Sequence, residues 1–202
     1  MASTPTVPAR RIGAATSKTR SQLVDAAEQL LLEEGHAAVT SRRVGARAGL
    51  KPQLVHYYFR SMEDLFLEVF RRRADENLAR AERALSEDGS LRTLWQLNAD
   101  LRGAAFNVEF VALANRHEAI RAEVARYAER FRAMQLAALR KSVDERGGLP
   151  GGLPPVAALV LMTGLTQVLS LERALGVTTG HDETLAFVER LIDTLAAPSA
   201  GG

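Results

Sequence analysis

Residues 40–59 constrain the fold more than any other part of the chain, because their order predicts two short helices joined by a glycine turn. Thr40 is of a residue type that caps helix N-termini, and Gly49 can adopt the positive φ that ends a helix. Pro52 is tolerated in the first turn of a second helix, where its missing N–H costs no bond. The apolar positions of the two helices are expected to face each other, at Val44, Ala48, Leu50, Val55 and Phe59. The segment therefore has the pattern of a helix-turn-helix.

The outward side of the second helix is polar and aromatic. It carries Lys51, Gln53, His56 and Tyr57. In a helix-turn-helix the second helix lies in the major groove of DNA, where Lys and Gln contact base edges and basic or aromatic groups hold phosphates. This surface predicts binding to double-stranded DNA.

The charge of the chain is unevenly divided. Residues 1–60 contain nine Lys or Arg and four Asp or Glu, whereas residues 61–202 contain seventeen and twenty, so the formal net charge of +2 separates into +5 and −3. Taken alone, the basic N-terminal part is explained equally well by a solvated surface. Next to a helix-turn-helix, the same excess favours contact with phosphates, which supply most of the non-specific affinity for DNA.

The composition excludes several other classes of protein. With 202 residues, 47% of them hydrophobic and 25% charged, the chain can bury a core as one large domain or as a small domain joined to a larger one. The absence of cysteine excludes disulfides and cysteine zinc sites, and it is consistent with the cytoplasm, where we expect the protein. The four histidines are scattered, and no metal-binding spacing, phosphate-binding glycine loop or nucleophile motif is present. We expect neither an enzyme nor a bound metal or cofactor.

Apolar periodicity predicts an all-α fold of about nine helices. We divide the chain into a disordered arm (1–16), a helix-turn-helix domain (17–61), a helical ligand-binding and dimerisation domain (62–197) and a flexible tail (198–202). The first helix is expected to pack across the two reading helices and to offer Lys18 and Arg20 to the DNA backbone. The arginine triplet at residues 71–73 lies about two helical turns beyond the helix-turn-helix, which is too far for a contact with the same DNA. We therefore expect these arginines to be solvated or salt-bridged.

The C-terminal part supplies further expectations about individual elements. The long helix after His117 is expected to expose one charged face, formed by Glu118, Arg121, Glu123, Arg126, Glu129, Arg130 and Arg132. The tandem Gly-Gly-Leu-Pro at residues 147–154 predicts a flexible, non-helical connection. Residues 156–171 lack charge, but these sixteen residues fall short of the ~20 that span a bilayer. We therefore expect a helix that is buried on all sides between partner chains, and no membrane contact. Asp182 is expected to cap the last helix.

The motif residues resemble the N-terminal domain of TetR-family transcription regulators. The resemblance lies in Thr40, Arg42 two residues later, a small residue at Gly45, the Ala48-Gly49 pair and a second helix ending in aromatics, followed at the family's spacing by Ser61-Met62-Glu63-Asp64-Leu65-Phe66. It covers about 50 residues, from near Thr19 to near Val69. Two positions depart from the family pattern, since His56 stands where most members have Tyr and Met62 where most have Lys. His56 can still donate to a phosphate, whereas Met62 cannot.

The resemblance implies roles for the DNA-facing residues. Arg42 aligns with the family's guanine-reading arginine, Gln53 is expected at an adenine or guanine, and Leu54 or Tyr57 at a thymine methyl. The residues expected to hold phosphates are Thr40, Ser41, Lys51, His56 and Tyr58. For Tyr58, packing in the core is an equal alternative. Arg10 and Arg11 of the arm are minor-groove candidates, with a solvated tail as the alternative.

The resemblance also implies a homodimer and a small-molecule switch. The candidate dimer interface consists of Leu161, Gly164, Leu165, Val168, Leu185, Val188, Ile192 and Leu195. The candidate contacts to a small apolar or amphipathic effector are Trp95, Phe106, Asn107, Phe110, Tyr127, Phe131, Met134 and Gln167, with Glu109 and His117 as further polar candidates. Both sets could instead be ordinary intrachain core. The expected function is a repressor released from a palindromic operator by its effector, and the alternative is an architectural DNA-binding protein without a ligand switch.

Overall fold

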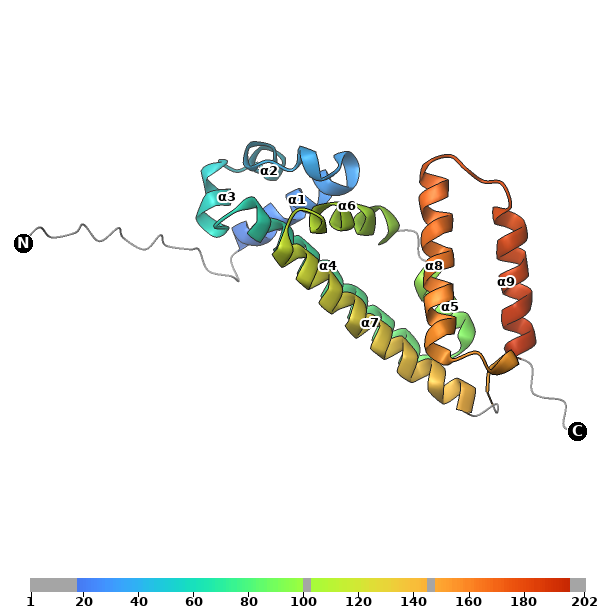
Figure 1. The fold of residues 1–202 in the computed structure, drawn as a ribbon. Helices are drawn as coiled ribbons and strands as arrows, with labels where there is room; N and C mark the ends of the chain where they lie inside the picture. The colour runs from blue at the N-terminus through green and yellow to red at the C-terminus, as the bar shows by residue number, and fades with distance from the viewer. Residues whose placement is uncertain (1–17, 100–102, 145–147, 197–202) are drawn as a thin grey trace, which may run out of the picture. The chain divides into compact units, whose positions relative to one another are not determined.

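The computed structural model describes residues 18–99, 103–144 and 148–196, and these residues form nine α-helices and no strand (Figure 1). The helices are α1 (Lys18–Glu34), α2 (Ser41–Ala48), α3 (Gln53–Tyr58), α4 (Met62–Glu87), α5 (Leu91–Ala99), α6 (Ala104–Ala114), α7 (Glu118–Asp144), α8 (Pro155–Ala174) and α9 (His181–Ala196). Two short 3₁₀ turns, η1 (His36–Ala38) and η3 (Pro150–Gly152), lie between them. The all-α prediction is confirmed. The predicted N-terminal arm and C-terminal tail lie outside the described residues.

The described chain divides into two compact units that do not follow chain order. The first unit contains the described residues up to Arg72 together with Glu109–Arg121, and the second contains Arg73–Val108 and the described residues from Ala122 onward. The division therefore falls inside α4, α6 and α7. The first unit joins the three N-terminal helices to the corner between α6 and α7.

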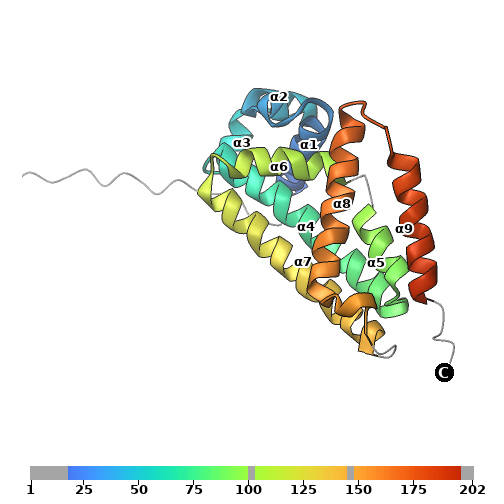
Figure 2. The same cartoon turned by 45° about the vertical axis from the view of Figure 1, so that its right-hand side comes forward.

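The core of the first unit forms where α1 crosses α2 and α3 (Figure 2). The buried face of α1 repeats at helical spacing, and it packs with the inward residues of α2, α3 and the start of α4. The shared core consists of Leu23, Ala27, Leu30, Leu31, Val44, Val55, Phe59, Leu65 and Val69. The predicted packing of the first helix across the two reading helices is confirmed. We call α1 to α3 the reading domain.

Arginines also attach α1 to α4. Arg72 forms ion pairs with Asp25 and with Glu28, the latter at 2.6 Å, which confirms a salt-bridged role within the arginine triplet. Arg20 donates to Glu68 at 2.5 Å, and its guanidinium lies 5.0 Å from the centre of the Phe59 ring. The expectation that Arg20 contacts the DNA backbone is therefore wrong, because an acidic partner on α4 and an aromatic face hold its side chain within the protein.

The core of the second unit is an apolar cluster around Trp95. The helix α5 contacts both α8 and α9 (Figure 2), and α7 contributes its C-terminal half. The cluster consists of Leu91, Leu94, Trp95, Leu139, Val143, Leu159 and Ile192. On α7, Glu123 was expected on the exposed charged face but is buried. It lies three residues after Ile120, hence on the same side of the helix, and its ion pair with Arg126 compensates the buried charge.

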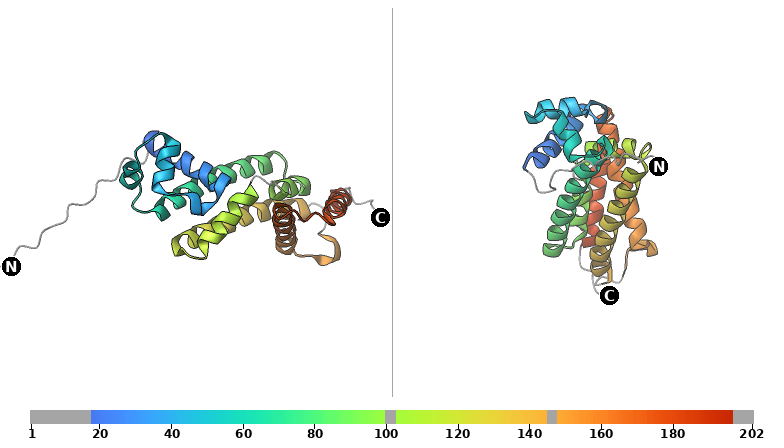
Figure 3. Two further views of the ribbon diagram at one scale, coloured as in Figure 1. Left: turned by 90° about the horizontal axis from the view of Figure 1, so that it is seen from above. Right: turned by 90° about the vertical axis from the view of Figure 1, so that its left-hand side faces the viewer.

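The helix α8 is only partly buried within a single chain. It begins at Pro155 as expected and is long and apolar enough to cross a membrane, but only 17% of its most apolar window is buried within the chain. The exposed fraction is 64% for Leu161 and 72% for Leu175, which follows the helix. Within a single chain α8 is thus not buried on all sides, and its burial between partner chains stays a prediction. The left panel of Figure 3, viewed from above, shows α8 beside α9.

Two predicted boundaries also shift. The tandem Gly-Gly-Leu-Pro contains one 3₁₀ turn rather than no helical structure, and its Gly151 has φ 65°. The last helix begins at His181, so Asp182 lies inside its first turn instead of capping it.

Candidate DNA-binding site

The ends of α2 are set by the two residues that the sequence singled out. Thr40 is extended (φ −118°, ψ 155°), and its Oγ1 accepts a hydrogen bond from the backbone N–H of Arg43 at 3.3 Å. Gly49 is left-handed (φ 67°, ψ 28°), and its N–H donates to the Ala46 carbonyl at 3.2 Å. The N–H of Leu50 then donates to the Gly45 carbonyl at 2.8 Å. Both predicted caps are confirmed.

The turn after α2 packs directly on that helix at Gly45. A Cβ atom at Gly45 would lie 3.0 Å from the carbonyl oxygen of Leu50 and 3.0 Å from the nitrogen of Pro52. Both atoms belong to the backbone and cannot rotate away. The missing side chain of Gly45 therefore allows the close approach that fixes α3 relative to α2.

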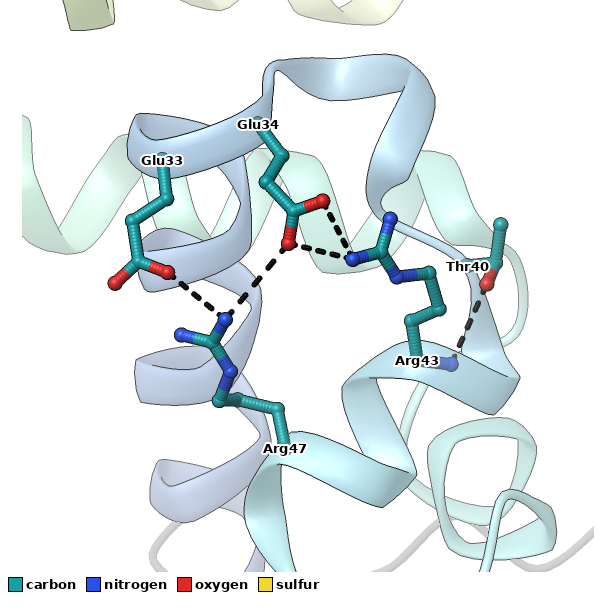
Figure 4. Close-up of polar contacts among 5 residues, drawn as sticks. All are labelled: Glu33, Glu34, Thr40, Arg43 and Arg47. Atoms are coloured by element: carbon teal, nitrogen blue, oxygen red, sulfur yellow. Dashed lines mark hydrogen bonds and ion pairs between the residues drawn. The ribbon is translucent and has the colours of Figure 1, made fainter.

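The three arginines of α2 have different surroundings. Arg43 donates to Glu34 at 2.6 Å, and Arg47 donates to Glu33 at 2.8 Å, so both are held against the end of α1 (Figure 4). The hydrogen bond from Arg43 lowers the pKa of Glu34, and the bond to Glu33 raises the pKa of Arg47. Arg42 is exposed and forms no ion pair with any residue that the structure describes. It is thus the arginine of α2 that is available to a partner.

The other residues predicted to contact DNA lie on one continuous stretch. Along the turn and α3, the exposed side chains are Lys51, Gln53, His56 and Tyr57, together with Thr40 before α2. Ser41, Leu54 and Tyr58 are half-buried. The ring of Tyr58 packs edge-on against Tyr57, with centroids 5.0 Å apart and planes at 87°. Half-burial leaves both alternatives for Tyr58, phosphate contact and core packing.

The sequence of the reading domain matches a known family. Residues 23–69 match the model of bacterial regulatory proteins of the tetR family. The chain is also 31% identical over 132 residues to the HTH-type transcriptional regulator BetI of Rhizobium meliloti (strain 1021). The aligned residues cover 60% of this chain and 64% of BetI. The reading domain is therefore a TetR-family domain. The match to BetI leaves about a third of that relative's length unaccounted for.

Several solved structures share the fold beyond the reading domain. E. coli NemR in its reduced form superposes with a TM-score of 0.71 at 19% identity, covering 86% of this chain and 97% of NemR. The fatty acid degradation regulator FadR of Bacillus halodurans gives 0.64 at 15% identity, covering 94% and 100%. A TetR-family regulator of Marinobacter aquaeolei VT8 gives 0.61 at 20%, covering 88% and 94%. These likenesses show the fold.

The candidate effector contacts are only partly brought together. In the second unit, Trp95 and Phe106 are buried, Met134 is half-buried, and Tyr127 stacks on Phe131 with centroids 5.9 Å apart. The Tyr127 hydroxyl accepts a hydrogen bond from Asn77, and burial raises the pKa of Tyr127. Asn107 and Gln167 are exposed. Phe110 lies in the first unit, 4.9 Å from Phe70 between ring centroids.

One polar group in the interior of the second unit was not predicted from the sequence. Gln135 is only 2% exposed, and its Nε2 has no hydrogen-bond partner among the residues that the structure describes. It precedes Leu139 of the apolar cluster by one helical turn, a spacing that places it on the buried face.

Within the described ranges, no three His, Asp or Glu side chains are placed to share a metal ion.

Glu109 and His117 belong, like Phe110, to the first unit, whereas the other candidate effector contacts belong to the second. In the first unit, Glu109 contacts His36 and His117 lies 3.5 Å from Glu63. No local sequence pattern connects these partners, because each pair joins distant parts of the chain.

The candidate dimer residues divide into two groups, one exposed to solvent and one packed in or against the apolar cluster of the same chain. Leu161, Gly164 and Val168 are exposed. Ile192 lies inside the apolar cluster of its own chain, and Leu165, Leu185 and Val188 pack against that cluster. The side chain of Leu195 is outside the described part. The structure adds exposed apolar side chains that the sequence analysis did not select, at Val160, Leu171, Leu175, Phe187 and Leu191.

Proposed function

We propose that this chain is a dimeric, sequence-specific DNA-binding regulator of transcription, which represses from a palindromic operator and is released by a small-molecule effector. The observation that carries the proposal is the geometry of α2. Its caps and Gly45 fix the helix-turn-helix, and Glu33 and Glu34 hold two of its arginines while Arg42 remains exposed. A rigid helix pair with a selected exposed arginine suits base recognition better than coating of DNA.

At the operator, Arg42 is proposed to donate two hydrogen bonds to a guanine, an interaction worth ~1–3 kcal/mol of discrimination. Gln53 opens α3 and is proposed to contact an adenine or guanine, with Leu54 or Tyr57 against a thymine methyl. Phosphate contacts are proposed for Thr40, Ser41, Lys51, His56 and Tyr58. They would fix the register of the domain on the duplex without reading its sequence.

A homodimer is supported by the apolar surface of α8 and α9. Leu161, Val168 and Phe187 are each more than half exposed, which is unusual for large apolar side chains on adjacent helices. A second copy of the chain would cover this surface and present two reading domains to a palindrome. Such a protein works in the cytoplasm, where its DNA is.

The effector is proposed to bind in the second unit. Trp95, Phe106 and the stacked Tyr127 and Phe131 offer apolar and aromatic contacts. The buried Nε2 of Gln135 is proposed to donate a hydrogen bond to an oxygen of the effector. Since Glu123 is paired with Arg126, these groups suit an uncharged apolar or amphipathic molecule.

Selection from a pool of random duplexes tests the proposal. The wild-type protein, Arg42→Ala and Arg140→Ala are each used to select, and the recovered duplexes are sequenced. Arg140 is an exposed arginine of α7 in the second unit, so this control loses the same charge away from the reader. We expect wild type and Arg140→Ala to recover one palindrome, and Arg42→Ala to lose or relax one position in each half-site. Binding that is sensitive to salt but blind to sequence would instead favour the architectural alternative.

A further inference from the structure

A carboxylate on α6 holds the turn that leads into α2. Glu109 Oε2 accepts a hydrogen bond from the backbone N–H of His36 at 2.7 Å and lies 2.6 Å from Nδ1 of the His36 ring. The two residues are 73 positions apart in the chain. A carboxylate with two such contacts is bound more firmly than a single surface ion pair, because one of its partners is the backbone itself.

The turn is shaped around this carboxylate. Gly35 has φ 80°, and a Cβ atom at this position would lie 3.3 Å from Oε1 of Glu109. The carboxylate thus occupies the space beside a residue without a side chain. Glu109 and His36 side chains are 26% and 35% exposed, so solvent competes only partly for this contact.

The held turn is directly continuous with the proposed DNA contacts. The N–H of Val39 donates to the His36 carbonyl at 3.1 Å, and the N–H of Thr40 donates to Ala38 at 3.1 Å. Val39 is buried, so the segment from His36 to Thr40 has little freedom. Thr40 then caps α2, whose first residues are Ser41 and Arg42.

The segment that carries Glu109 is itself anchored in the first unit. Phe110 is buried against Phe70, and His117 at the end of the same segment lies 3.5 Å from Glu63 at the start of α4. Glu109 is therefore supported by neighbouring contacts on both sides along the chain, which makes it suitable for holding another element in place.

We infer that Glu109 is a positioning residue for DNA reading: it does not touch DNA, but it orients Thr40, Ser41 and Arg42 by fixing the turn at His36. This inference rests on the proposed function and adds a residue outside the reading domain to it. It also predicts which truncation weakens DNA binding more, because the bond from the His36 backbone N–H to Glu109 survives loss of the His36 ring. Truncation of Glu109 should therefore cost more than truncation of His36.

Operator affinity of the full-length chain tests the inference. The variants are Glu109→Ala, Glu109→Leu and His36→Ala, with Glu129→Gln as a control at an exposed glutamate of α7. Fluorescence anisotropy measures binding to the duplex that the wild-type protein selects and to a scrambled duplex of equal length. Urea unfolding reports stability in parallel. We expect operator affinity to fall about tenfold for Glu109→Ala and less for His36→Ala, with little change on the scrambled duplex.

A double-mutant cycle with Arg42→Ala separates positioning from general destabilisation. If Glu109 acts through the start of α2, Glu109→Ala should weaken operator binding less than about threefold once Arg42 is absent. Equal losses on both duplexes, or an undiminished effect in the Arg42→Ala background, would overturn the inference. So would unchanged operator affinity of folded Glu109→Ala. Should that variant fail to fold, Glu109→Leu decides, because leucine cannot accept the bond from the backbone N–H of His36, and wild-type affinity in folded Glu109→Leu would overturn the inference.

The same experiment distinguishes this inference from the proposed function. If the wild-type protein selects no sequence, the proposed function and the inference both fail. If it selects an operator that the Glu109 variants bind equally well, only the inference fails.

Discussion

Replacing Gly45 with alanine tests the geometry that fixes the reading domain. In an unobstructed helix this substitution would gain about 1 kcal/mol of helix propensity. At Gly45 the new Cβ would lie 3.0 Å from the Leu50 oxygen and from the Pro52 nitrogen, and 3.1 Å from the Pro52 Cα. Three backbone atoms would have to move, and such overpacking costs about 1–3 kcal/mol. We therefore expect a net loss of stability of about 1 kcal/mol, and a loss of operator affinity greater than tenfold because α3 is displaced.

Gly49→Ala provides the matched comparison. Gly49 needs its positive φ of 67°, but a Cβ there would meet no atom within 4 Å. This variant should lose about 1 kcal/mol from backbone strain without changing how α2 packs on the turn. Urea unfolding followed by circular dichroism compares the stabilities, and anisotropy compares the operator affinities. Hydrogen exchange of the α2 and α3 amides locates the change.

The two variants should therefore agree in stability and differ in DNA binding. A Gly45→Ala protein that is as stable as the wild type and binds the operator as tightly would refute the close approach of α2 to the turn. Equal operator affinities of Gly45→Ala and Gly49→Ala would show that helix placement does not depend on Gly45.

Three further predictions concern other parts of the molecule. Phe187→Arg should convert the dimer to a monomer in sedimentation equilibrium without lowering the stability of the single chain, because Phe187 is 58% exposed there. In that monomeric background, Gly164→Ala should raise the unfolding free energy in urea by about 1 kcal/mol, since a Cβ at Gly164 meets nothing within 4 Å. The bond from Arg20 lowers the pKa of Glu68, so this carboxylate stabilises the fold above the unfolded value of about 4.3, and that contribution is lost as pH falls through the lowered value. Glu68→Gln should flatten the acid side of a plot of urea midpoint against pH, and an unchanged slope would contradict this assignment.

The reading domain could be predicted from sequence because local rules determine it. Thr40 and Gly49 act within three residues of themselves, and the periodicity of α1 alone defines which side is buried. The helices of the second unit were predictable for the same reason. Some of their boundaries shifted, as at His181.

Contacts between distant residues could not be predicted in this way. On α9, one apolar set contains Val188 and Ile192 and another contains Phe187 and Leu191, and periodicity does not tell which set faces the chain's own core. Arg20 looked like a phosphate contact because its partner, Glu68, lies 48 residues away. Glu109 looked like an effector contact because nothing in its own helix indicates His36. Each of these roles depends on which element packs beside the residue.

The ion pairs of the reading domain should reduce the salt dependence of its affinity for DNA. Each phosphate that a cation neutralises contributes about 0.9 to the slope of log affinity against log salt concentration. Arg20, Arg43 and Arg47 each form an ion pair with a carboxylate within the protein. Among the described residues up to Arg60, the exposed cations without an ion pair are Lys18, Arg42, Lys51 and Arg60. Because Arg42 is proposed to contact a base, the slope per subunit should then approach about 3 rather than the about 5 that all the other described cations would give. Operator occupancy should therefore tolerate changes in ionic strength better than the charge of the sequence suggests.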